Sequence, residues 1–563
     1  MAHDGPPCST TGSEGEAEQA VRSEERPEPS SVGGHAPAGP SGTARNTLLW
    51  LLLLTALHLG LACPRLGRVP RAIMDESWEA TTGWSLAFEG RLRNPVIPDR
   101  DGIDRAFVQP RVTQSLVLAV VYRLLGFALI DGRLASVFVG LVAAWGVFCL
   151  LRAWASLGVA GLATVLFIAD SQVFLATRVV RPEIYLLCAS VWMLALLARG
   201  ITRGRLWTCF AAWLVGGIGC YTHPNIALVI LPTLPMIFWH LGLRRRAWAV
   251  LASYGLGGIL AVLPFAAWVA FAHARWDVSF FAQLGGWYMQ PLDNAGNVLV
   301  KEFYRWWTYL RLPHRGPWVL VVVASVVAGL FRPNPLHVWG LAQIVGHAVL
   351  CPLLIRKGSP HYLVVLSPWL AAFVALWASQ LWRAALAPSA GPLRRRSLQA
   401  VALGSIALTL AVHVAGNLYL LHLHRRADYV EVCRRIAAQI EPGSRVHGNL
   451  VFWTGLHEYP YLSEVPQWTT RTSEIAERLR SRLRAFDPQY VVRSSDMCLT
   501  LGGLGPRRAQ INRDFQHAAD FVDYWEALEN LCKDSYLRQH RAVLLDRFET
   551  YDFGTIEVHR LQR

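Results

Sequence analysis

Residues 46–63 read NTLLWLLLLTALHLGLAC, and residues 74–90, which follow closely, read MDESWEATTGWSLAFEG. The first stretch has the length and the apolar character of a membrane span. The second begins with two carboxylates, Asp75 and Glu76, at the start of a helical pattern. The sequence therefore predicts a retained membrane anchor that ends beside an acidic helix start.

Apolar runs of this kind recur along the 563 residues, of which 53% are hydrophobic, and the mean hydropathy is +0.29. Such a composition does not fit a soluble enzyme. The net charge of +15 could suggest a nucleic-acid partner. The arginines, however, gather in short loops between apolar runs, as the cytoplasmic loops of membrane proteins require. We therefore expect an α-helical polytopic membrane protein and no nucleic acid.

Further spans are predicted from the apolar runs that follow the first one. They lie at about 132–151, 158–176, 182–199, 206–221, 223–242, 248–271, 317–331, 335–354, 361–382 and 398–421.

Arginine clusters in three short loops, 199–205, 244–246 and 394–396, set the predicted orientation. All three loops should be cytoplasmic. They agree with a cytoplasmic N-terminus only if the apolar stretch 113–130 does not cross the bilayer. This stretch would then lie in the interface as part of a long outer loop, 64–131. The prediction is about 11 crossings with the C-terminal part outside.

The polar ends of the chain differ from its apolar middle. Residues 1–45 are rich in Pro, Gly, Ser, Ala and Glu, which predicts a disordered tail. Residues 46–421 form the predicted transmembrane domain, which has a second long outer loop, 272–316, rich in Trp and Tyr. Residues 422–563 alternate between helical and strand patterns, which predicts a small α/β domain with an accessory role.

Within this last domain, the helical patterns cover 428–440, 472–486 and 512–532, and the strand patterns cover 444–450, 487–494, 541–549 and 553–561. The last two strands should form a hairpin. If the domain is periplasmic, Cys498 and Cys532 could form a disulfide, although sequence cannot establish the pairing.

Polar residues from distant parts of the chain follow the apolar spans and fall on the same outer face in this topology. Ionisable groups at a membrane edge are costly, so a face that collects them is a candidate active site. These residues are Asp75, Glu76, Arg178, Arg181, Glu183, His223, Lys357, His361 and Tyr362.

Each candidate also has a structural explanation. The carboxylates Asp75 and Glu76 could serve only to complement the helix dipole. Arg178 and Arg181 could extend to lipid headgroups. A histidine before a proline, such as His223, is commonly structural, although it is also a good metal ligand. His361 and Tyr362 could anchor the interface without a catalytic role.

The order of these pieces resembles the GT-C glycosyltransferases. A first span followed by Asp-Glu is similar to the group that contains the protein O-mannosyltransferases and the bacterial aminoarabinose transferases of lipid A. The resemblance runs over roughly 46–382. It continues through RLASVFVGLVAAWGVFCLLRAW (133–154), TRVVRPEIYLLCASVWMLALL (177–197), YTHPNIALVILP (221–232) and KGSPHYLVVLSPWLA (357–371).

The resemblance implies roles for the matching residues. Asp75 matches the loop aspartate of the family and would take the proton from the acceptor hydroxyl, with Glu76 beside it. Glu183 and His223 would position the acceptor or bind a metal. The donor phosphate would be held by cationic and polar side chains, which favour phosphate oxygens; these are Arg178, Arg181, Lys357, His361 and Tyr362.

The implied function is an inverting glycosyltransferase of a bacterial plasma membrane. Its partners would be a polyprenyl-phosphate sugar and an acceptor hydroxyl on a protein, lipid or glycan. A divalent metal ion is left open, because no ligand set has recognisable spacing. Glu79 and Glu89 add carboxylates to the first loop, so the identity of the base is also open. The alternatives are a transporter or flippase, which would predict internal repeats, and a non-catalytic binder of lipid-linked glycans.

The orientation can be tested with reporter fusions. Fusions at residues 203, 245 and 395 should report the cytoplasm, because arginine-rich loops are retained there. Fusions at residue 290 and after residue 430 should report the outside. A cytoplasmic C-terminal reporter would mean that 113–130 crosses the bilayer and that the candidate residues do not share one face.

Overall fold

The computed structural model describes residues 40–98, 101–288, 300, 302–303, 306, 316–331, 334–355, 360–464, 480–495 and 534–562. The chain divides into a short unit, Met1–Leu48, and a large unit, Leu49–Arg563. The large unit holds all of the described helices and strands except the start of the first helix. Residues 1–39 of the predicted tail 1–45 are not among the described residues.

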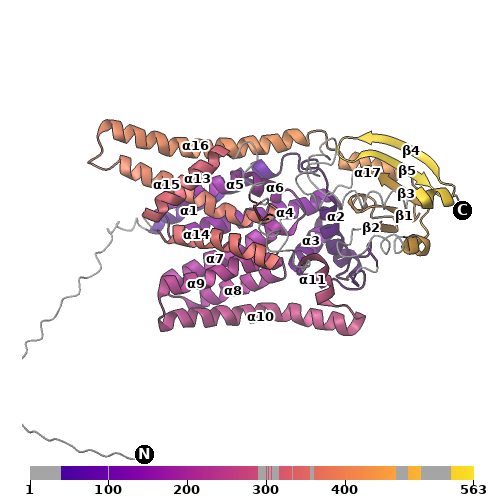
Figure 1. The fold of residues 1–563 in the computed structure, drawn as a ribbon, viewed down its shortest axis with the longest axis horizontal. Coiled ribbons are helices and arrows are strands. Elements are labelled where there is room, and N and C mark those ends of the chain that lie inside the picture. Colours follow the sequence, from indigo (N-terminus) through magenta and orange to yellow (C-terminus); the bar gives the residue numbers. More distant parts are fainter. Residues whose placement is uncertain are drawn as a thin grey trace, which may run out of the picture. The chain divides into compact units, whose positions relative to one another are not determined.

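Every predicted span coincides with a helix or with a pair of shorter helical segments, as the ribbon in Figure 1 shows. The α-helices are α1 (Pro40–Ala62), α4 (Leu129–Leu151), α5 (Leu157–Ala169), α6 (Ser171–Ala176), α7 (Pro182–Arg203), α8 (Leu206–Cys220), α9 (Ala227–Leu241), α10 (Arg245–Trp276), α13 (Gly316–Phe331), α14 (Pro335–Leu350), α15 (Ser367–Ala385) and α16 (Pro392–Leu423). Three short helical segments adjoin them, namely η2 (Pro224–Ile226), η3 (Cys351–Ile355) and η4 (Pro360–Leu366).

Among the described residues, eight helical segments are long and apolar enough to cross a membrane. The predicted polytopic membrane protein is therefore confirmed. The predicted spans 158–176, 206–221 and 317–331 correspond to shorter apolar helices. The number of about 11 crossings stays a prediction for this reason.

The predicted span 158–176 is not one helix. It breaks at Asp170, where α5 ends and α6 begins. The Asp170 carboxylate accepts hydrogen bonds from the backbone N–H groups of Gln172 and Val173, at 2.7 and 3.3 Å. A side chain that caps a new helix start in this way competes with continuation of the helix before it. The carbonyl freed at Ala169 accepts a bond from the side chain of Asn417 in α16, at 2.9 Å.

The predicted outer loop 64–131 contains three helical segments, α2 (Met74–Trp84), η1 (Ser85–Glu89) and α3 (Val112–Leu125). Helices α2 and α3 pack closely at Gly83. A Cβ atom added at this glycine would lie only 2.6 Å from the Leu118 Cβ. Helix α3 coincides with most of the apolar stretch 113–130. Its 14 residues rise about 21 Å, less than the hydrocarbon core of roughly 30 Å. The second loop, 272–316, includes α11 (Phe280–Tyr288) and lies largely outside the described residues beyond it.

The C-terminal region contains a five-stranded sheet in the order β2-β1-β3-β5-β4. Strand β1 pairs in parallel with β2 and β3, while β5 pairs antiparallel with β3 and β4. Two short helices accompany the sheet, and the α/β character predicted for this region is confirmed. The elements are α17 (Tyr429–Ala437), β1 (Val446–Asn449), α18 (Leu450–Trp453), β2 (Tyr461–Glu464), β3 (Tyr490–Ser494), β4 (Val543–Thr550) and β5 (Gly554–Arg560).

Most of the predicted elements of this region are present, including the closing hairpin β4–β5. Strand β2 was not predicted. The predicted helix 472–486 is described only over 480–486, where it is helical, and the predicted helix 512–532 lies outside the described residues. Cys498 and Cys532 lie outside them too.

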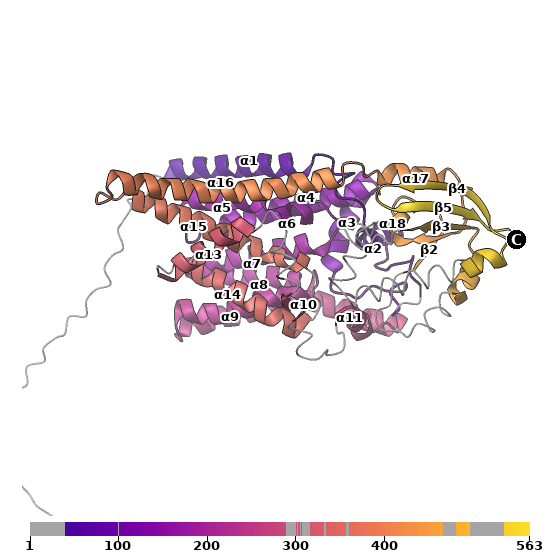
Figure 2. The same ribbon diagram turned by 45° about the horizontal axis from the view of Figure 1, so that its top comes forward.

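The sheet region holds α2 in place. The Ser77 hydroxyl lies 2.7 Å from the Thr454 hydroxyl and donates to the Val451 carbonyl at 3.1 Å. About two turns further along, at the last residue of α2, Trp84 packs edge-on against Trp453 with ring centroids 5.5 Å apart. Figure 2 shows the strands and α18 beside α2. The C-terminal region therefore buttresses the helix that begins with Asp75 and Glu76.

Candidate active site

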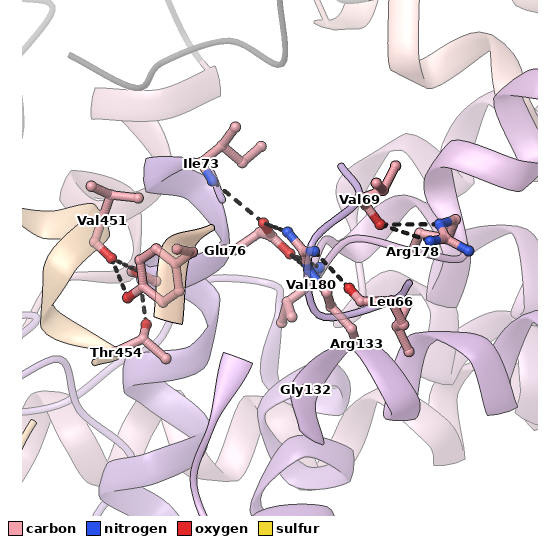
Figure 3. Close-up of polar contacts among 12 residues, drawn as sticks. Leu66, Val69, Ile73, Glu76, Gly132, Arg133, Arg178, Val180, Val451 and Thr454 are labelled. Atoms are coloured by element: carbon pink, nitrogen blue, oxygen red, sulfur yellow. Dashed lines mark hydrogen bonds and ion pairs between the residues drawn. The ribbon is translucent and has the colours of Figure 1, made fainter. Parts of the chain in front are cut away.

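The first predicted catalytic pair, Asp75 and Glu76, is divided by the structure. Glu76 is fully buried. Its carboxylate accepts two bonds from the Arg133 guanidinium, at 2.9 and 2.7 Å, and one from the Val180 N–H at 3.0 Å. The Ile73 N–H lies 3.4 Å away, so Glu76 also closes the first turn of α2. Figure 3 shows these contacts, which direct Glu76 toward α4.

Arg178 is also fully buried. Its guanidinium donates to the backbone carbonyls of Leu61, Ala62, Pro64 and Val69, at 2.6 to 3.2 Å. The bonds to Val69 are drawn in Figure 3. These carbonyls lie at the end of α1 and in the segment after it, so Arg178 fixes the path of the chain where it leaves the first helix.

Asp75, Arg181 and Glu183 do come together. The Arg181 Nη1 donates to Asp75 at 2.7 Å, and its Nη2 donates to Glu183 at 2.6 Å. The Asp75 side chain is 45% exposed, whereas that of Glu183 is only 4% exposed. Burial opposes the charge on Arg181, but the two carboxylates raise its pKa above the usual value. Arg181 is therefore a permanent cation that links the starts of α2 and α7.

These residues line a small cavity of about 50 Å³, which has room for a few water molecules or one polar group. The starts of α2, α7, η2 and η4 all contribute to it. Helix starts carry partial positive charge and favour anions. The lining residues are Met74, Asp75, Trp78, Glu79, Arg111, Arg181, Pro182, Glu183, His223 and Tyr362.

Two further charges in the cavity form a second ion pair, between Glu79 and Arg111. Asp75 and Glu79 are four residues apart in α2 and therefore share one face of the helix. Arg111 was not predicted; the only signal was its position just before the apolar stretch 113–130. Burial raises the pKa of Glu79 to about 7. The charge of Arg111 lowers this pKa, and the negative charges of Asp75 and Glu183 raise it by smaller amounts than burial does.

His223 and Tyr362 complete the cavity, with ring centroids 5.3 Å apart. The His223 Nδ1 accepts a bond from the Asn225 N–H at 3.1 Å. His361 is next to Tyr362 in the chain but does not line the cavity. Lys357 lies outside the described residues. Among the residues that are described, no group of three or more His, Cys, Asp or Glu side chains is arranged to hold a metal ion.

Comparisons with known proteins agree with this architecture. The sequence model of the dolichyl-phosphate-mannose-protein mannosyltransferase family matches residues 110–271. A comparison with curated protein sequences finds no match. The fold of this chain is that of the GT-C glycosyltransferases, and the resemblance drawn from the sequence is confirmed at the level of the fold.

Two solved structures illustrate the likeness. ArnT from Cupriavidus metallidurans, bound to undecaprenyl phosphate, aligns with a TM-score of 0.58 and 16% identity over 92% of this chain and 98% of ArnT. The archaeal oligosaccharyltransferase AglB from Archaeoglobus fulgidus, in complex with an inhibitory peptide and a dolichol-phosphate, aligns with a TM-score of 0.52 and 11% identity over 80% of this chain and 70% of AglB.

The buried pair of Glu76 and Arg133 generates a stability prediction. Arg133→Met should destabilise the protein by about 3–5 kcal/mol, because it leaves a carboxylate buried without its cation. Thermal unfolding in detergent measures this loss. The double variant Glu76→Gln, Arg133→Met should recover part of it. Arg152→Met, an exposed position at the other end of α4, is the control. Unfolding of Arg133→Met at the wild-type temperature would contradict the assignment.

Glu79 generates a pH prediction. Its pKa is about 7 in the folded protein and about 4.3 in an unfolded chain. The folded state therefore holds the proton more tightly, and the stabilisation present at low pH is lost as the pH rises to 7. Between pH 5 and pH 8 the wild type should lose about 2–3 kcal/mol relative to Glu79→Gln.

The measurement for this second prediction is the thermal unfolding midpoint of both proteins across that pH range. Glu89→Gln, at an exposed carboxylate of η1, is the matched control and should not show the same trend. Parallel pH profiles for the wild type and Glu79→Gln would show that Glu79 ionises as an ordinary carboxylate.

Proposed function

We propose that this protein is an inverting glycosyltransferase that moves a sugar from a polyprenyl-phosphate donor to an acceptor hydroxyl at the outer face of a bacterial plasma membrane. The observation that carries the proposal is the cluster in which Arg181 joins Asp75 to Glu183 at converging helix starts. The polyprenyl phosphates bound to ArnT and AglB support a donor of the same chemical class. The N-terminus would be cytoplasmic and the C-terminal region periplasmic.

Asp75 is our candidate for the general base. It is the most exposed of the three carboxylates in the cavity, so an acceptor hydroxyl can reach it. The ion pair with Arg181 holds its carboxylate in a fixed orientation, which favours proton transfer. Glu183 and Glu79 are each buried against an arginine. Glu183, with His223 nearby in the same cavity, would orient the acceptor.

Arg181 would also bind the donor phosphate. Its hydrogen bonds to Asp75 and Glu183 use Nε and one N–H on each Nη, which leaves a second N–H on both Nη atoms. A cation and several helix starts near the leaving phosphate stabilise the charge that develops there. Lys357, His361 and Tyr362 remain proposed phosphate ligands, and Tyr362 already lines the cavity.

The proposed reaction is a single displacement. The acceptor oxygen forms a bond to the anomeric carbon while its proton passes to Asp75. The bond between that carbon and the phosphate oxygen breaks, and the electron pair leaves with the polyprenyl phosphate. One base opposite the leaving group suffices, in contrast to a retaining mechanism with two carboxyl groups.

We assign Glu76 and Arg178 to positioning instead of direct chemistry. In the part of the chain that the structure describes, Glu76 bonds to Arg133 and to backbone N–H groups, and Arg178 bonds to backbone carbonyls and lies over the Phe174 ring. Neither lines the cavity. Both hold the segments that bring Asp75 and Arg181 together.

The base can be tested with Asp75→Asn. This change keeps the size of the side chain but removes its basicity. Transfer from a panel of undecaprenyl-phosphate sugars to a membrane extract should fall by about 10²–10⁴-fold, the usual contribution of a general base. Binding of undecaprenyl phosphate, measured by native mass spectrometry, should persist.

Glu89→Gln is again the control and should transfer sugar at the wild-type rate. If Asp75→Asn retains full activity, the base lies elsewhere, with Glu183 as the next candidate. If the wild type binds undecaprenyl phosphate but consumes none of the sugar donors, a non-catalytic binder would replace the transferase.

A further inference from the structure

A second and much larger cavity lies apart from the candidate active site. It has a volume of about 540 Å³ and shares no lining residue with the first cavity. Its walls come from the segment just after α1, from the first turns of α4, and from the residues just beyond α16. The lining residues are Cys63, Arg65, Leu66, Gly67, Arg68, Ile130, Leu134 and Arg425.

Three exposed arginines give this basic cavity its charge. Arg65 and Arg68 come from the segment after α1, and Arg425 comes from the far end of the transmembrane sequence. Within the described residues no carboxylate pairs with any of them; the only side-chain contact of Arg425 is with His422, at 3.3 Å. Three guanidiniums without an internal counterion favour an anion with several oxygens, and phosphate is the group that arginine recognises best.

An apolar ridge leads away from these cations. Ile130, Leu134 and Phe138 are spaced four residues apart on α4, so they lie on one face of that helix. Their side chains are 43%, 37% and 63% exposed. Helix α4 is one of the helices that are long and apolar enough to cross a membrane. The exposed face therefore meets lipid chains, and the ridge begins at the cavity that holds the arginines.

The segment that carries Arg65 and Arg68 is rigid. Arg178 donates to the carbonyls of Leu61, Ala62, Pro64 and Val69, and Arg133 donates to that of Leu66 at 2.8 Å. Figure 3 shows Leu66 and Val69 held in this way. A wall that is already fixed loses little conformational freedom when a ligand binds, which favours affinity.

We propose that this basic cavity binds an anionic phospholipid. The lipid phosphate lies between Arg65, Arg68 and Arg425, and an acyl chain runs along Ile130, Leu134 and Phe138. Charge complementarity selects an anionic headgroup, and the adjoining ridge selects a lipid over free phosphate. The site is independent of the proposed transfer reaction.

Native mass spectrometry of the full chain in a neutral detergent tests this proposal. Phosphatidylglycerol should bind the wild type more tightly than phosphatidylcholine of the same chain length. The variant Arg65→Asn, Arg68→Gln, Arg425→Gln should weaken phosphatidylglycerol binding at least about tenfold, since contacts to charged groups contribute strongly. Asparagine is used at position 65 because its φ is +56° there.

Arg123→Gln, at an exposed arginine in the last turn of α3, is the matched control and should bind as the wild type does. Phe138→Ala should weaken the binding of both lipids without changing the preference for one headgroup over the other. Equal affinity for the two lipids, or wild-type binding by the triple variant, would overturn the proposal. Displacement of phosphatidylglycerol by undecaprenyl phosphate would also overturn it, because the cavity would then belong to the donor.

Discussion

The buried carboxylate of Glu76 is the contact on which the arrangement of the site depends. It accepts hydrogen bonds from Arg133 of α4 and from the backbone before α7, while its own helix is α2. A carboxylate with no exposure is stable only when its charge and its lone pairs are satisfied. That requirement fixes three segments against one another. As a result Asp75, one residue earlier, and Arg181, one residue after Val180, meet at 2.7 Å.

Two neighbouring arginines show how position in the chain differs from position in space. Arg178 and Arg181 would share a face if the chain between them were helical. It is not, because α6 ends at Ala176 and α7 begins at Pro182. Arg178 turns to the carbonyls at the end of α1, and Arg181 turns to the carboxylates. One residue type thus serves a structural role and a candidate functional role within a single short loop.

The apolar runs were enough to predict the helices, because a membrane span depends on local composition and length. The helix starts with Asp75 and Glu183 were equally visible. The partners of Glu76 and Glu79 could not be predicted, because they depend on how distant segments pack. Arg133 lies inside an apolar span, Arg111 comes just before α3, and nothing local pairs them with Glu76 and Glu79. The break at Asp170 was missed because a single capping side chain outweighed an otherwise continuous apolar pattern.

The contact between Ser77 and Thr454 has a consequence for the order of events during biosynthesis. These residues are separated by 377 positions, so a ribosome working at about 5–20 residues per second needs roughly 20–75 s to reach the second after the first. During that interval α2 has been made and its buttress has not. The contact that holds the acidic helix can form only after residue 454 has been synthesised, which is later than α16, the last of the long apolar helices among the described residues. The candidate active site of the nascent protein therefore stays incomplete until most of the chain has been synthesised.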